Sequence, residues 1–208
     1  MAARIATGKF PQRIDLAPIL TEPAVRPVDR PEVRERPMTI ASRYGELFQM
    51  SYITRDLDAA MAHCKAEMGI EHFDTTDAEV EVLSFGKMRP LKIRAAFANI
   101  GRNQFELIQP ISGAIEIYTD EVDLSKHIIN FHHIAIAVRG GLDQWRALLA
   151  EVRASGDDFA FLSPVEATEE DKVCFCYVDT RKRLGLYTEY LWVDEAIKPI
   201  PAMPDLDG

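Results

Sequence analysis

The sequence predicts an α+β fold in which two βαβββ modules follow a proline-rich N-terminal arm. Three observations lead to this fold class. Prolines gather at the two ends of the chain, the same order of strands and helix occurs twice between them, and polar residues interrupt matching strands of the two repeats. An internal repeat of this kind indicates two copies of one unit that bury their apolar faces together.

Proline is concentrated at both ends of the chain. Six prolines lie before residue 43 and three lie after residue 195. Because proline has no backbone N–H and disrupts helices and central strands, residues 1–42 are expected to form an extended arm and residues 196–208 a tail. Two interpretations of the arm stay open: disorder, and docking against a neighbouring subunit or the body of the chain.

The first module is expected over residues 43–112. It opens with an apolar strand at 48–54. Asp56 then has the side chain of a helix N-cap, and Gly69 that of a helix stop, on either side of LDAAMAHCKAEM. Three further stretches have the composition of strands, and they read VEVLSF, KIRAAFANI and FELIQPI.

The second module is expected over residues 131–195, after a linker at 113–130. It repeats the same order, with a strand at 131–138, a turn at Gly140 and Gly141, and a helix over LDQWRALLAEVRAS. The strands that follow this helix read FAFLSP, KVCFCYVD and LYTEYLWV.

Composition excludes several classes of partner. The 208 residues carry a formal net charge of −9, which disfavours nucleic acid because its phosphates would be repelled. Three cysteines without a disulfide pattern fit a reducing compartment. No apolar run approaches the ~20 residues of a membrane span, and no apolar segment follows the basic N-terminus as in a signal peptide. A cytoplasmic location is therefore expected.

Four polar residues interrupt apolar strands at matched positions in the two modules. Gln49 and His133 lie in the first strands, and Glu106 and Glu189 lie in the fourth. Gln49 and Glu106 are 57 residues apart (106 − 49). His133 and Glu189 are 56 residues apart (189 − 133). Because a buried polar group needs a partner, this common spacing predicts one shared site in the concave space between the modules.

Strand alternation predicts which side chains face this site. His133 shares a face with the small residues Ala135 and Ala137, whereas His132 faces the helix. A register slip of one residue would exchange the two histidines, so His132 stays the alternative to His133. Gln49 has a second interpretation as a residue that bonds only to backbone. Two carboxylates, an imidazole and an amide oxygen suit a divalent ion such as zinc, nickel, cobalt, manganese or iron.

Four stretches within residues 46–193 resemble the vicinal oxygen chelate superfamily, which includes glyoxalases, bleomycin-resistance proteins and extradiol dioxygenases. They read QMSYITRDLDAA, FELIQP, HHIAIAV and YTEYLW, and they look most like the methylmalonyl-CoA epimerase and glyoxalase I branches. The resemblance implies that the modules pair into a glyoxalase-like half-open barrel. It also implies that Gln49, Glu106, His133 and Glu189 are metal ligands.

The function expected from this site is that of a metal-dependent isomerase, epimerase or lyase of glyoxalase type. A metal polarises the substrate carbonyl, and Glu189 or Glu106 removes the neighbouring proton. Two alternatives stay open. One is a metal-free small-molecule binding protein of the resistance type. The other is a ring-cleaving dioxygenase, which fits less well because its iron site uses two histidines and one carboxylate.

Two basic stretches offer a place for the anionic part of a CoA or glutathione conjugate, or are ordinary charged turns. They contain Lys87, Arg89, Lys92 and Arg94, and then Arg181, Lys182 and Arg183. The expected partners are a small-molecule carbonyl substrate, free or carried on such a conjugate, and a second copy of the chain in a homodimer. Whether the site forms within one chain or across two stays open.

Overall fold

The computed structural model describes residues 40–120 and 122–194. The tail predicted at 196–208, and the arm predicted at 1–42 apart from its last three residues, lie outside the described residues. No helix in the described ranges is long and apolar enough to cross a membrane.

The first half of the described chain has the order βαβββ after one short helix. Its elements are α1 (Ile40–Tyr44), β1 (Gly45–Ile53), α2 (Leu57–Met68), β2 (Asp74–Ser84), β3 (Lys87–Ile100) and β4 (Asn103–Gly113). Helix α2 ends as its sequence predicts. The Asp56 side chain accepts a hydrogen bond from the Ala59 backbone N–H, and Gly69 closes the helix in the left-handed region at φ 70°.

The second half repeats this order after the short helix α3 (Glu116–Thr119). Its elements are β5 (Asn130–Val138), α4 (Leu142–Ser155), β6 (Phe159–Ser163), β7 (Val173–Val178), α5 (Arg181–Leu184) and β8 (Tyr187–Val193). The predicted α+β class with a duplicated βαβββ order is therefore confirmed. Helices α1, α3 and α5 were not expected, because four or five residues are too few to show a helical period.

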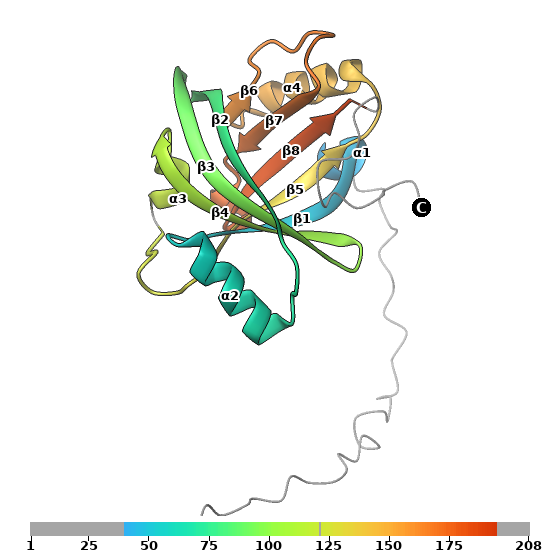
Figure 1. Ribbon diagram of the computed structural model, residues 1–208. Coiled ribbons are helices and arrows are strands. Elements are labelled where there is room, and N and C mark those ends of the chain that lie inside the picture. The colour runs from blue at the N-terminus through green and yellow to red at the C-terminus, as the bar shows by residue number, and fades with distance from the viewer. Residues whose placement is uncertain (1–39, 121, 195–208) are drawn as a thin grey trace, which may run out of the picture. The chain divides into compact units, whose positions relative to one another are not determined.

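The eight strands close into one barrel in the order β1-β4-β3-β2-β6-β7-β8-β5. The two halves join at two places. β1 pairs antiparallel with β5 from Gly45 to Ile53, whereas β2 meets β6 at only two residue pairs, Leu83 with Leu162 and Ser84 with Phe161. The wide junction between β1 and β5 brings the first strands of the two repeats together inside a single chain (Figure 1).

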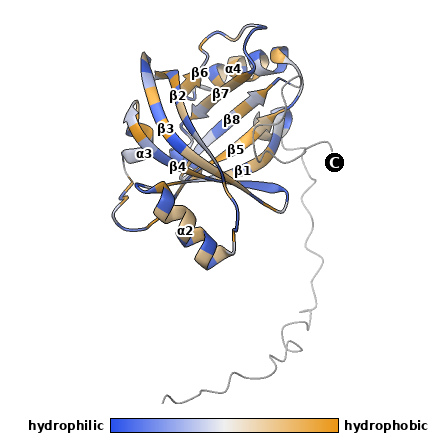
Figure 2. Cartoon of the chain, in the orientation of Figure 1, coloured by the Kyte–Doolittle hydropathy of each residue, from blue (hydrophilic) through white to orange (hydrophobic). Residues whose placement is uncertain are grey.

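Each long helix covers the outside of its own half of the barrel. Leu57, Ala60 and Cys64 of α2 pack on β3 and β4. Trp145, Leu148 and Val152 of α4 pack on β5, β7 and β8, where Cys174 and Cys176 are also buried. Figure 2 shows hydrophilic and hydrophobic residues interspersed along β2 and β3, as expected for strands with one face inside a barrel and one outside.

Candidate active site

The four matched polar residues lie on four adjacent strands of the barrel, ordered β4, β1, β5 and β8. Gln49 is paired with Ala135 across the β1–β5 junction, and Ala135 is paired with Glu189 on its other side. Ser51 of β1 is paired with both Glu106 and His133. This register places the site where the two halves join, and the small Ala135 side chain leaves space in front of the sheet.

Three of these side chains line a cavity of about 230 Å³ inside the barrel. The polar part of its lining is Gln49, Gln104, Glu106 and Glu189, and the apolar part is Phe48, Ala78, Phe97, Phe175 and Leu191. His133 lies beneath this lining and is fully buried. Within residues 40–120 and 122–194, no Lys or Arg lines this cavity.

The His133 ring is the centre of the polar cluster. Its Nε2 atom lies 3.1 Å from Glu189 Oε2 and 3.6 Å from Glu106 Oε2, and the Tyr177 hydroxyl is 3.4 Å from the same nitrogen. Glu106 Oε2 is buried and has no hydrogen-bond partner. Two carboxylates therefore face one imidazole nitrogen in a place shielded from water.

His132 lies beside His133 because of a β-bulge. The register of β5 against β1 shifts between His133 and Phe131, so His132 is the extra residue. It is buried, and its Nδ1 lies 2.9 Å from Nδ1 of His133. The sequence alternation had placed His132 under the helix. That placement is wrong, because a bulge breaks the strict alternation of faces on which it depends.

The hydrogen bonds of His132 determine where the proton of each ring lies. Nε2 of His132 is 2.7 Å from the carbonyl oxygen of Ile117, so it must donate. Burial lowers the pKa of both rings to about 3, and both are therefore neutral near pH 7. Nδ1 of His132 then accepts from Nδ1 of His133, which leaves Nε2 of His133 with a lone pair that faces the two carboxylates.

Burial raises the pKa of both carboxyl groups to about 8. For Glu106 the neighbouring charge of Glu189 raises the pKa further, and the nearby Ser51 hydroxyl opposes the rise. For Glu189 a hydrogen bond from Tyr177 opposes it. The site without a bound cation thus favours protonated carboxyl groups, because nothing else compensates their charge in this apolar interior.

Gln49 bonds to a side chain and not only to backbone. Its Nε2 donates a hydrogen bond to Oε1 of Gln104, the neighbouring residue on β4. This bond occupies the amide nitrogen and leaves the carbonyl oxygen as the end available to a ligand. Gln104, Tyr177 and Ser51 were missed by the sequence reasoning. Gln104 could have been found, because it lies two residues before Glu106 and so shares its face.

The cluster fits a divalent metal ion in its donor chemistry. In the described ranges, no group of three or more His, Cys, Asp and Glu side chains already has the spacing of a metal centre. The separations of 3.1 and 3.6 Å from His133 Nε2 to the carboxylates are nevertheless close to those between two ligands of one metal, roughly 3.0–3.4 Å for bonds of about 2.1 Å. Oε2 of Glu106, which has no hydrogen-bond partner, and the unprotonated Nε2 of His133 are suitable ligand atoms.

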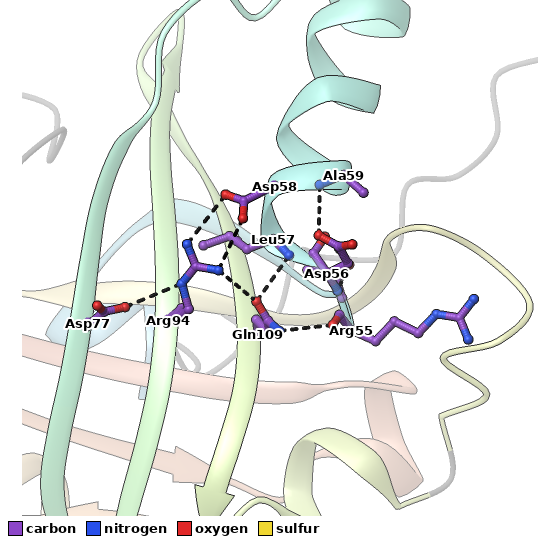
Figure 3. A network of polar contacts seen from close by, with 9 residues as sticks. Arg55, Asp56, Leu57, Asp58, Ala59, Asp77, Arg94 and Gln109 are labelled. Carbon is purple, nitrogen blue, oxygen red and sulfur yellow. Dashed lines mark hydrogen bonds and ion pairs between the residues drawn. The ribbon is translucent and has the colours of Figure 1, made fainter.

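The basic residues of β3 pair with acids outside the cavity. Arg94 lies between Asp77 of β2, at 3.5 Å, and Asp58 at the start of α2, at 3.4 Å (Figure 3). Arg89 pairs with Glu116 at 2.7 Å, and Lys92 lies 3.7 Å from Glu79. In the second basic stretch, Arg181 and Arg183 pair with Asp179 and Asp157. These pairs engage five of the seven basic residues of the two stretches.

Comparison with known proteins gives a family match and several similar solved structures. Residues 48–175 match the family model described as the Glyoxalase/Bleomycin resistance protein/Dioxygenase superfamily. No curated protein matches the chain.

Three solved structures illustrate the similarity. A Streptomyces coelicolor methylmalonyl-CoA epimerase in complex with 2-nitronate-propionyl-CoA is 19% identical, with 72% of this chain and 98% of that chain covered and a TM-score of 0.47. The methylmalonyl-CoA epimerase from Mycobacterium tuberculosis is 16% identical, with 72% and 88% covered and a TM-score of 0.43. A hypothetical protein from Bacillus halodurans C-125 is 16% identical, with 74% and 98% covered and a TM-score of 0.44.

Proposed function

Because this chain belongs to the glyoxalase/bleomycin resistance protein/dioxygenase superfamily, we propose that it is a metal-dependent isomerase, epimerase or lyase. Its reaction removes a proton from the carbon next to the carbonyl group of a small molecule. One observation supports this proposal above the others. Two buried carboxylates and an unprotonated imidazole nitrogen converge inside the barrel, and among the described residues no Lys or Arg lines the cavity to neutralise them.

The residues that would hold the metal are Gln49, Glu106, His133 and Glu189. Such an ion would polarise the substrate carbonyl and stabilise the negative charge that develops on its oxygen. The hydrogen bond from Gln49 to Gln104 orients the amide, and the bond between the two histidines directs the His133 lone pair toward the carboxylates. The walls of Phe48, Phe97 and Phe175 exclude water from the reacting carbon.

The two carboxylates are held differently, and this difference suggests their roles. Glu189 Oε2 lies 3.1 Å from His133 Nε2, within hydrogen-bond distance. Glu106 has one buried oxygen without a hydrogen-bond partner and lies farther from His133, at 3.6 Å. We assign Glu106 as the general base, because its carboxylate can turn toward a substrate with fewer bonds to break.

The proposal is tested by metal analysis and by deuterium exchange. The purified protein is expected to hold close to one divalent ion per chain. It should also exchange the α-protons of α-hydroxycarbonyl compounds for deuterium in D2O, as followed by NMR. The double variant Glu106→Ala, His133→Ala should lose both properties, whereas Glu170→Gln, which changes an exposed carboxylate, should keep them.

Two results would contradict the proposal. Full metal content in the double variant would show that these residues are not the ligands. A wild-type protein that binds carbonyl compounds equally well in EDTA, without any α-proton exchange, would instead support the metal-free binding protein of the resistance type.

A further inference from the structure

The cavity has an unusual division between its polar and apolar walls. In the described part of the chain, its polar lining consists of Gln49, Gln104, Glu106 and Glu189. The remaining lining consists of three phenylalanines, a leucine and an alanine, namely Phe48, Phe97, Phe175, Leu191 and Ala78. A ligand that reaches the carboxylates is therefore surrounded by aromatic and aliphatic side chains over the rest of its surface.

The size of the cavity limits the ligand. Its volume is about 230 Å³, whereas an apolar cavity of about 150 Å³ in another protein is large enough for benzene. The space inside the barrel thus holds a single six-membered ring together with a short polar side chain. Three phenylalanine rings around this space favour a flat aromatic group, because ring pairs add to the free energy of simple burial.

The charge of the cavity limits the ligand further. Two glutamates already lie in it, and a divalent ion held by them would bring their summed charge to zero. A carboxylate or phosphate on the substrate would then be an extra buried anion with no cation to compensate it. Three basic residues of β3 are absent from the described lining and form ion pairs elsewhere. Arg89 pairs with Glu116 and Lys92 with Glu79, and Arg94 pairs with Asp58 and Asp77 (Figure 3).

We propose that the substrate is an uncharged carbonyl compound with one aromatic ring, and that the cavity discriminates against compounds with a carboxylate or phosphate beside the carbonyl. This inference rests on the proposed function, because it takes the carboxylate cluster as the place where the carbonyl group reacts. It separates this protein from enzymes whose reacting group is itself a carboxylate.

Three small probes test the inference. 2-Hydroxyacetophenone is neutral and carries a phenyl ring, phenylglyoxylate has the same ring and a carboxylate, and hydroxyacetone is neutral without a ring. Each has two adjacent oxygens. Their dissociation constants are measured by calorimetry and ligand-observed NMR on the full chain, both loaded with Zn²⁺ and treated with EDTA. We expect 2-hydroxyacetophenone to bind at least tenfold more tightly than either other probe to the Zn²⁺-loaded protein.

A positive charge placed in the cavity wall should weaken the preference for the neutral aromatic probe over phenylglyoxylate. Ala78 is half-buried in the cavity lining, so Ala78→Lys can keep its ammonium group near the opening while its stem covers the wall. This variant should bind phenylglyoxylate at least tenfold more tightly than the wild type does. Thr75→Lys is the matched control. Thr75 is exposed and lies three residues before Ala78 on β2, so its side chain points to the opposite face of the strand and the added charge lies outside the barrel.

The results separate this inference from the proposed function. Equal or tighter binding of phenylglyoxylate or hydroxyacetone by the wild type would overturn the substrate class, as would the absence of binding by all three probes. Neither result changes the metal content of the wild type and of the double variant, which tests the proposed metal ligands separately. Conversely, tight binding of 2-hydroxyacetophenone with no exchange of its α-protons would support the substrate class and refute the proposed reaction.

Discussion

Replacing His132 tests whether the two-histidine chain controls the site. The ring connects the Ile117 carbonyl oxygen, at 2.7 Å, to Nδ1 of His133, at 2.9 Å, and it is buried. His132→Phe keeps a ring of similar size but removes two hydrogen bonds. The Ile117 carbonyl oxygen then lacks its donor, and the Nδ1–H group of His133 lacks its acceptor. Since each costs about 1–3 kcal/mol, the variant should lose roughly 2–6 kcal/mol of unfolding free energy. His132→Asn should lose only about half of this, because its Oδ1 can replace Nδ1 as acceptor.

The same pair of variants should separate stability from ligand orientation. With no acceptor beside it, Nδ1 of His133 no longer has a reason to carry the ring proton. The affinity for a divalent ion should then fall about 10–100-fold in His132→Phe, the usual effect of losing the partner of a metal-ligating histidine, and less in His132→Asn. Nitrogen-15 NMR of the imidazole rings reports the tautomer of His133 directly. A wild-type spectrum with the proton on Nε2, or an unchanged tautomer and metal affinity in His132→Phe, would refute the reasoning.

Three further predictions follow from the burial of this cluster. First, the metal-free protein should be most stable between about pH 4.5 and 6.5. Below that window the unfolded chain binds protons that His132 and His133, with pKa lowered to about 3, do not bind. Above it the folded chain keeps protons on Glu106 and Glu189, with pKa raised to about 8, that the unfolded chain has lost. Two protons give a slope of about 3 kcal/mol per pH unit on each side. Urea unfolding in EDTA measures both slopes, and Glu106→Gln, Glu189→Gln should remove the alkaline one. Second, binding of Zn²⁺ at pH 7 should release protons from the two carboxyl groups. Calorimetry in buffers of different ionisation enthalpy measures this release, and a binding heat that is the same in every buffer would contradict it. Third, Ala135→Val should cost about 1–3 kcal/mol of unfolding free energy, because Ala135 is fully buried between its neighbours on β1 and β8. An unchanged midpoint of urea unfolding would show that the space in front of Ala135 is larger than described.

Local signals in the sequence predict most of the fold. Asp56 and Gly69 mark the two ends of α2, because capping depends on residues next to each other in the chain. The alternation of β4 correctly assigns Phe105 and Leu107 to the helix side and Glu106 to the interior. The matched spacing of Gln49, Glu106, His133 and Glu189 predicted a shared location, and the structure places these residues on adjacent strands. Their role as ligands stays a prediction.

The parts that the sequence could not predict depend on contacts between distant strands. The bulge at His132 exists only in the pairing of β5 with β1, and a single strand gives no sign of it. Three basic residues of β3, namely Arg89, Lys92 and Arg94, have acidic partners on α3, β2 and α2. These ion pairs join elements that are distant in the chain, so the sequence of β3 alone does not reveal them. The bond between Gln49 and Gln104 likewise crosses from one strand to another.

The joining of β1 to β5 within one polypeptide has a consequence for how the protein works in dilute solution. All eight strands around the carboxylate cluster belong to the same molecule, so an isolated copy already contains all four residues of the proposed site. Under the proposed function, turnover per mole of chain should hence stay constant as the protein is diluted, whatever assemblies form at high concentration. A pocket that needed residues from two copies would instead lose activity on dilution.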